Sequence, residues 1–220
     1  MNKKIALIGG TGPEGKGLAK RLAITGNQIF IGSRKQERGK EIAEELTNEL
    51  NEYPQICIKG GDNREMAELS EIIIIVVPYS AHKNTLMQIE NELEGKIVID
   101  AVVPMEFQKG PRSIEVEAGS ATEEAAQILE NSTVIGAFHN LSAEILMDLK
   151  KDVIGDVLIT GNNKEAKQEV SSLAEEIGSI RAVDAGPLRN SKHVENLTVL
   201  LIGINGRYKA HSSIIITDIN

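Results

Sequence analysis

Residues 5–17 read IALIGGTGPEGKG, an apolar run followed directly by a glycine-rich turn. Ile5 to Ile8 has the length and continuous apolar character of a strand buried in a sheet. Gly10, Gly12 and Gly15 then satisfy the spacing G-x-G-x-x-G. In this setting the three glycines allow a tight turn, approach of a pyrophosphate to the backbone, and close packing of helix on sheet. The stretch predicts a strand, turn and helix that cradle a dinucleotide.

The same turn allows two other interpretations. It could be a glycine-rich turn with no ligand, because the pattern alone is weak, but its position between a strand and a helix favours the cradle. Gly10, Gly15 and Lys16 also match most of the Walker A pattern G-x-x-x-x-G-K. Gly17, however, stands where Ser or Thr would bind magnesium, so the sequence does not indicate a nucleoside triphosphatase.

The composition sets wide limits on what the protein does. A chain of 220 residues suggests one large or two small domains, and its net charge of -8 argues against non-specific binding of nucleic acid. Its single cysteine, Cys57, excludes an intramolecular disulfide and a CxxC metal site, and we interpret it as a small core residue. The longest apolar run, residues 72–78, is too short to span a bilayer. We therefore expect a cytoplasmic protein with no membrane partner and no bound metal.

Apolar runs of strand length alternate with stretches of helical periodicity through most of the chain. Continuous apolar strands indicate burial on both faces, as in a parallel sheet with crossover helices. The expected fold is therefore α/β, with a doubly wound Rossmann-type parallel sheet whose ligand binds at the carboxyl ends of the strands. The expected strands are 4–8, 28–32, 55–59, 72–77, 96–103 and 133–137, and the expected helices are 35–50, 80–94 and 120–130.

The pattern becomes less regular after His139, which predicts a Rossmann domain over residues 1–140 and a smaller C-terminal α+β unit over 141–220. In the helix expected at 191–206, a stripe of apolar residues has the spacing of one buried face, either in the core or in a dimer contact. The polar segment 102–119 is expected to be a loop, either a lid over the ligand or a simple connector. The remaining elements expected here are strands 156–160 and 180–183 and helix 164–178, and the stripe is Leu197, Leu200, Leu201 and Ile204.

The residues after the second expected strand indicate which dinucleotide binds. An NAD enzyme places Asp or Glu there to bond the ribose 2′-hydroxyl. This chain instead has Ser33, Arg34 and Lys35, with Arg38 one helical turn further on. A hydroxyl and several cations suit a 2′-phosphate, so we predict NADP rather than NAD. The alternative is that the cations form only a solvated helix face.

Gly-Gly-Thr-Gly-x-x-Gly-Lys-Gly-Leu-Ala and the later Gly-Ser-Arg resemble the archaeal NADPH-dependent coenzyme F420 reductases. The resemblance continues in the same order along the rest of the chain, through Val-Val-Pro at 76–78 and 102–104, Ala-Phe-His at 137–139 and Asp-Ala-Gly-Pro-Leu at 184–188. It implies reversible hydride transfer between reduced coenzyme F420 and NADP, both acting as small-molecule substrates, in a homodimer.

The resemblance also implies roles for individual residues. Those implied to contact NADP at the turn and the 2′-phosphate are Thr11, Gly12, Pro13, Glu14, Ser33, Arg34 and Arg38. Those implied to lie along the nicotinamide half of NADP are Val77, Ala81, Val103 and Ala143. Pro78 is expected to bind cofactor beside them, because small apolar residues at the strand ends suit a pocket that excludes water. Those implied to line the deazaflavin pocket are His139, Leu141, Lys192, Asn196 and Thr198.

Hydride transfer between two cofactors needs alignment and a dry cleft rather than a protein nucleophile. His139 is the best candidate for a catalytic residue, because it ends a strand at the ligand edge and could donate a hydrogen bond to the substrate ring. A capping or packing histidine is the alternative, as a surface lysine is for Lys192. Two other functions stay open: an NADPH-dependent reductase of a small carbonyl or imine, and a non-catalytic NADP sensor.

Overall fold

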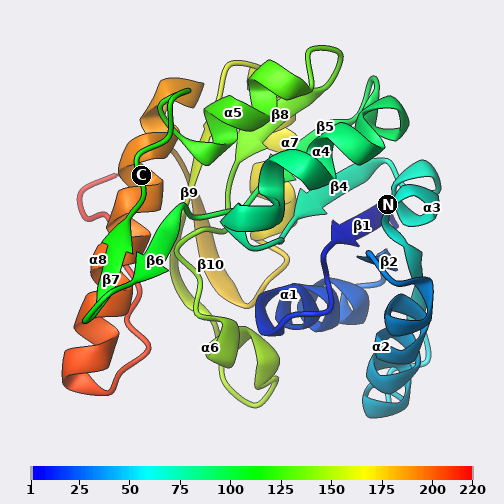
Figure 1. Cartoon of the computed structure of the whole chain (residues 1–220). Coiled ribbons are helices and arrows are strands. Elements are labelled where there is room, and N and C mark those ends of the chain that lie inside the picture. Colours follow the sequence, from blue (N-terminus) through cyan, green and yellow to red (C-terminus); the bar gives the residue numbers. More distant parts are fainter. Residues whose placement is uncertain (1, 220) are drawn as a thin grey trace.

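The computed structural model describes residues 2–219, and it has an α/β fold built on one eight-stranded sheet (Figure 1). The strand order is β10-β9-β8-β5-β4-β1-β2-β3. Two further short strands, β6 and β7, form a separate hairpin. The strands are β1 Lys4–Ile8, β2 Gln28–Ser33, β3 Cys57–Asp62, β4 Ile72–Ile75, β5 Ile97–Asp100, β6 Met105–Phe107, β7 Pro111–Ser113, β8 Thr133–Gly136, β9 Ile154–Gly161 and β10 Ser179–Asp184.

Helices cover both faces of the sheet, which confirms the doubly wound architecture. Ile5 and Leu7 of β1 pack into one core with α1, α2 and α7, whereas Ala6 and Ile8 pack into a second core with α3, α4 and α5. This alternation follows from the two-residue period of a strand. The helices are α1 Pro13–Ile24, α2 Gln36–Glu49, α3 Asn63–Glu68, α4 Tyr79–Leu93, α5 Ala121–Ile128, α6 Ala143–Met147, α7 Lys164–Ala174 and α8 Ser191–Tyr208, with a 3-10 turn at Leu188–Asn190.

Within the large sheet, the six neighbouring strands β8, β5, β4, β1, β2 and β3 all pair in parallel, as the continuous apolar strands predicted. β9, however, runs antiparallel to β8, and β10 lies parallel to β9. One sheet therefore continues across residue 140. The division of the chain into two domains at that residue stays a prediction.

Segment 102–119 is not the plain polar loop that we expected. Met105–Phe107 and Pro111–Ser113 pair in antiparallel register, and β7 packs against α8. Three-residue strands with exposed side chains leave no apolar alternation to find in the sequence.

The buried face of α8 is also different from the predicted stripe. Val194, Thr198 and Leu201 are buried, whereas Leu200 is 57% exposed. The prediction that Leu200 belongs to a face buried within the chain is therefore wrong, because neighbouring elements contact a face rotated away from it. Cys57 is only half-buried at the start of β3, so it is not a core residue either.

Arg21 ties the glycine-turn helix α1 to the later part of the chain. Its guanidinium donates hydrogen bonds to the carbonyls of Ile145, Leu146, Asp148 and Lys151, at 2.7 to 3.1 Å. These carbonyls lie at the end of α6 and just after it, where helical partners are lacking. The contact fixes α6 beside α1. None of the helices within residues 2–219 is long and apolar enough to cross a membrane.

Candidate functional site

A cleft of about 1550 Å³ opens at the carboxyl ends of the parallel strands. One wall consists of the glycine turn and the ends of β2, β4 and β5, and the other of residues 139–144, α8, the β6–β7 hairpin and the chain after α8. A pocket for a single drug-sized ligand is usually about 300–1,000 Å³. This cleft is therefore large enough for a dinucleotide together with a second ring system.

The glycine turn is shaped by backbone contacts and leaves free space at one position. The amide of Gly10 donates to the carbonyls of Leu7 and Gly32, both at 3.1 Å. A Cβ on Gly15 would lie 2.6 Å from the Cα of Gly10, so the helix can approach the turn only with glycine there. A Cβ on Gly12 would meet nothing within 4 Å. The open side of Gly12 is where a phosphate could approach the backbone.

The polar cluster after β2 lies in the same cleft as the turn. Ser33 is buried, and its hydroxyl accepts a hydrogen bond from the amide of Lys35 at 3.3 Å. Arg34, Lys35 and Arg38 line the cleft with largely exposed side chains. Arg38 also pairs with Glu41 at 2.7 Å. The structure therefore brings these four predicted residues together around one end of the dinucleotide cradle.

Asn63, at the start of α3, is a cleft residue that sequence reasoning missed. Its side-chain oxygen lies 3.4 Å from the amide of Gly9, and it lines the cleft beside the end of β2. The side chain of Asp62 caps α3 by accepting from the amides of Arg64 and Glu65. The signal was present as Gly-Gly-Asp-Asn at residues 60–63, where β3 ends and the helix cap of α3 begins.

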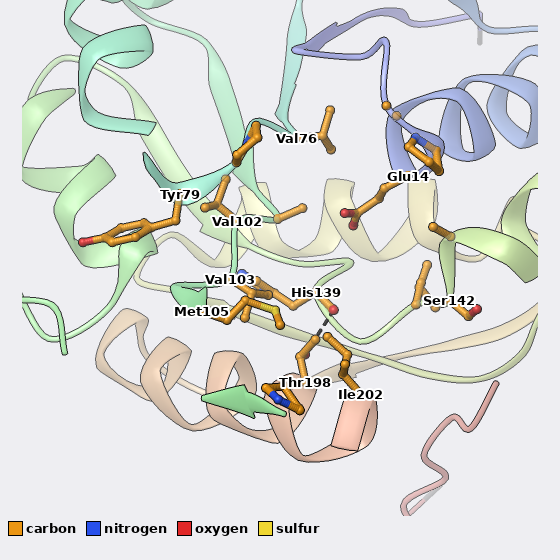
Figure 2. Close-up of a pocket in the computed structure, with 18 of the residues that line it drawn as sticks. Glu14, Val76, Tyr79, Val102, Val103, Met105, His139, Ser142, Thr198 and Ile202 are labelled. Carbon is orange, nitrogen blue, oxygen red and sulfur yellow. Dashed lines mark hydrogen bonds between the residues drawn. The ribbon is translucent and has the colours of Figure 1, made fainter. Parts of the chain in front are cut away.

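The ends of β4 and β5 contribute an apolar wall. Val77, Pro78 and Ala81 line it from the β4–α4 junction, and Val103 lines it after β5. Val76, Ala101 and Val102, which were not predicted, extend the same wall. Figure 2 shows Val76 and Val102 at one side of the cleft and Val103 further along it, beside Met105 and His139. Such a surface excludes water from a planar ring.

His139 also lines the cleft and is 3% exposed. Neither of its ring nitrogens has a hydrogen-bond partner within the described chain. Burial lowers the pKa of His139 to about 4, so the ring is neutral near pH 7. Its carbonyl accepts a hydrogen bond from the hydroxyl of Thr198 at 3.0 Å (Figure 2). An unpaired buried imidazole in a cleft is a ready partner for a ligand, because leaving it unpaired is unfavourable.

The backbone before His139 is strained. Phe138 is fully buried and has φ = 69°, a conformation that bulky residues rarely adopt. Strain of this kind is maintained only where surrounding contacts enforce it. Here it turns the chain at the end of β8 so that His139 reaches the cleft.

Leu141, Ala143 and Thr198 line the cleft as predicted positions on its second wall, but Lys192 and Asn196 do not. These two residues border a separate small depression beside the segment after β7, and the ammonium of Lys192 lies 3.5 Å from a carboxylate oxygen of Glu115. A helix turns about 100° per residue, so they cannot share the cleft-facing side of α8 with Thr198 and Leu201. The structure therefore does not bring them to the predicted pocket.

Glu14, in the first turn of α1, has its carboxyl group in the cleft, where Figure 2 shows it between Val76 and His139. Burial raises the pKa of this carboxyl to about 8. A carboxylate beside a phosphate cradle would repel the phosphates, whereas a neutral carboxylic acid would not.

The chain matches the family model described as "NADP oxidoreductase coenzyme F420-dependent" over residues 4–104. It is 41% identical to the F420-dependent NADP reductase of Methanothermobacter marburgensis, with 92% of each chain covered. The chain belongs to the F420-dependent NADP reductase family. A second family relative, from Methanocaldococcus jannaschii, is 39% identical over 94% of each chain.

A solved structure has the same fold as the present chain over nearly its whole length. The crystal structure of a candidate F420-dependent NADP reductase from Arthrobacter superposes with a TM-score of 0.81, at 23% identity, and covers 97% of this chain and 98% of that one. At this level of identity the comparison establishes the Rossmann-type architecture.

Proposed function

We propose that this protein catalyses reversible hydride transfer between reduced coenzyme F420 and NADP, the pair of redox partners named for its relatives. The observation that carries the proposal is one continuous cleft. It joins the glycine turn and the cations after β2 to an apolar wall and to the unpaired imidazole of His139. When bound, the two cofactors supply the donor and acceptor carbons of the hydride.

The dinucleotide half of the cleft fits NADP. The open side of Gly12 accepts the pyrophosphate, and the amides at the start of α1 face it with the positive end of the helix dipole. Arg34, Lys35 and Arg38 neutralise the 2′-phosphate, and Ser33 hydrogen-bonds to it.

The other half of the cleft positions the two rings and excludes water from them. Val77, Ala81 and Val103 form the apolar surface for the nicotinamide. His139 offers a neutral imidazole to the deazaflavin ring, and Thr198 fixes the backbone of His139 through its hydrogen bond. Because the protein has only to align and desolvate the rings, proximity accounts for most of the catalysis.

The test is to mix the purified protein with NADPH and oxidised F420 and to follow loss of the deazaflavin visible absorbance. Turnover supports the proposal. Turnover only with a small carbonyl or imine would replace it with the second enzyme function considered above. Tight binding of NADPH with no turnover on either substrate class would make the protein an NADP sensor.

The proposal includes a homodimer that acts in the cytoplasm. Leu200 and Tyr208 are 57% and 77% exposed on α8, and such exposed apolar side chains suit a contact between two copies. The chain carries one cysteine, Cys57, which fits a reducing compartment. Light scattering of the purified protein and fractionation of cells test these two points.

A further inference from the structure

Glu14 is an anomaly in the cleft, because it places a carboxyl group in a site proposed for a polyanion. It extends from the first turn of α1 into the space between Val76 and His139 (Figure 2). Within residues 2–219 it forms no ion pair within 4.0 Å and no side-chain hydrogen bond. Buried or half-buried carboxyl groups normally have such partners. An unpaired one facing a ligand cleft indicates a partner in the ligand.

Two other charged groups, a cation on α1 and a carboxylate on α6, have partners, unlike Glu14. Lys16, also on α1, pairs with Glu45 at 2.6 Å. Glu144 of α6 pairs with His211, from the chain after α8, at 3.2 Å. His139 is neutral near pH 7. The remaining titratable or charged side chains that line the cleft are Arg34, Lys35 and Arg38 after β2, Tyr79 at the start of α4, Lys109 in the hairpin, and Arg207 and Lys209 at the end of α8.

We propose that Glu14 distinguishes oxidised from reduced dinucleotide through its protonation state. The inference rests on the proposed function and concerns the nicotinamide half of the cleft, where Glu14 faces the wall that includes Val76. The oxidised nicotinamide ring carries a positive charge and the reduced ring is neutral. A carboxylate therefore stabilises the oxidised ring by direct attraction, and a carboxylic acid accommodates the reduced ring without an unpaired charge.

The direction of the pH effect follows from the burial that raises the pKa of Glu14 to about 8. Below that pH the carboxyl is mostly protonated, and the oxidised dinucleotide lacks its counter-charge. Above it the carboxylate is present, so the affinity for NADP⁺ relative to NADPH rises with pH. A shift of one unit in the pKa between the two complexes corresponds to a tenfold change in that ratio.

Calorimetric titration near pH 8, in two buffers with different ionisation enthalpies, counts the protons exchanged on binding. Wild-type protein should release protons when it binds NADP⁺ and take them up when it binds NADPH. The 2′-phosphate is common to both ligands, so its own protonation cancels in the difference. Binding is measured without F420, so the proton consumed in deazaflavin reduction does not enter.

Glu14→Gln keeps the shape of the side chain and removes the titrating group. In this variant both ligands should exchange equal numbers of protons, and the ratio of the two dissociation constants should stay flat between pH 7 and 9. In the wild type we expect that ratio to change by about tenfold across the same range. Glu144→Gln is the matched control, because it removes a carboxylate of the same cleft that already has a partner, and it should keep the wild-type proton difference.

The outcomes separate the two proposals. If the wild type binds both ligands with equal proton numbers, or if Glu14→Gln keeps the wild-type difference, Glu14 does not select between the redox states, although the proposed function stands. If the wild type binds neither dinucleotide, the proposed function fails and the role of Glu14 fails with it.

Discussion

The Nε2 atom of His82 on α4 lies 2.6 Å from a carboxylate oxygen of Asp100, at the end of β5, and neither side chain is exposed. The Nδ1 atom lies 3.0 Å from Glu124 on α5. Burial alone would lower the pKa of His82, but the two carboxylates outweigh burial and raise it to about 9. Asp100 also accepts a hydrogen bond from the amide of Val102, on the apolar wall of the cleft. This charged cluster supports the wall from behind.

Replacing His82 with Ala should lower the free energy of unfolding by about 3–5 kcal/mol, because it leaves the buried carboxylate of Asp100 without its cation. Urea unfolding followed by circular dichroism measures the loss. His193→Ala is the control: His193 is exposed, so the effect should stay within about 0.5 kcal/mol. Equal effects of the two substitutions would contradict this account of His82.

The same histidine predicts how stability depends on pH. Its pKa is about 9 in the folded protein against an ordinary value of 6.5. The stabilisation that protonated His82 gives the folded protein is therefore fully present below pH 6.5. It declines as pH rises from 6.5 to 9 and is absent above that range. Comparing the unfolding free energies of the wild type and His82→Ala at pH 6 and pH 9 tests this, because the difference between them should shrink at the higher pH.

Substituting alanine for two glycines of the turn should affect different properties, namely stability at Gly15 and NADPH affinity at Gly12. Gly15→Ala puts a Cβ 2.6 Å from the backbone of Gly10, so it should cost about 1–3 kcal/mol of stability. Gly12→Ala meets nothing within 4 Å, so the protein should keep its stability but lose affinity for NADPH by at least about tenfold. Thermal unfolding and NADPH fluorescence titration distinguish the two. Tight NADPH binding by Gly12→Ala would show that the phosphates do not approach there.

Arg34→Ala should raise the Michaelis constant for NADPH by about tenfold or more and leave that for NADH nearly unchanged, because only NADPH has the 2′-phosphate. Steady-state kinetics with both nucleotides gives the ratio. Lys40→Ala is the control on α2, since Lys40 pairs with Glu37 at 3.5 Å and does not line the cleft. An unchanged NADPH to NADH preference in Arg34→Ala would refute the assignment of the 2′-phosphate site.

His139→Leu should stabilise the protein and impair its function. It removes two buried nitrogens that have no partner in the free protein, which should add about 1 kcal/mol to the free energy of unfolding. It should also raise the Michaelis constant for F420 by about tenfold, with NADPH affinity retained. A loss of stability would indicate that His139 is a packing residue rather than a ligand contact.

Leu200→Glu should convert the proposed dimer to a monomer, because it would place a charge in the contact formed by α8. Multi-angle light scattering gives the mass directly. Gln168→Glu, an exposed change on α7, is the control, because it adds the same single negative charge away from α8. A wild type that already has the monomer mass would remove the dimer from the proposal.

The parallel strands and the glycine turn were predictable because each depends on local sequence: four to six apolar residues, then a fixed spacing of Gly10, Gly12 and Gly15. The arrival of Ser33 and Arg34 at the same cleft follows from parallel topology, which places strand ends at one edge. These features need no knowledge of tertiary contacts.

Other features depend on contacts between distant segments and were not predicted. The pairing of His82 with Asp100 and Glu124 joins residues 18 and 42 positions apart, and no local pattern marks it. The antiparallel entry of β9 depends on the route of the chain after Phe138. The placement of Lys192 and Asn196 in the deazaflavin pocket was predicted from the family resemblance alone. Which face of α8 lines the cleft depends instead on how the helix packs against distant segments.

The contacts of Arg21, together with the sheet that runs unbroken from β8 into β9, limit how substrates can enter. A rotation of residues 141–220 against residues 1–140 would break the pairing of β8 with β9. It would also break the hydrogen bonds that the buried Arg21 donates to four carbonyls. Loading and release should therefore proceed without large change in molecular dimensions, and small-angle scattering should give the same radius of gyration with and without NADP.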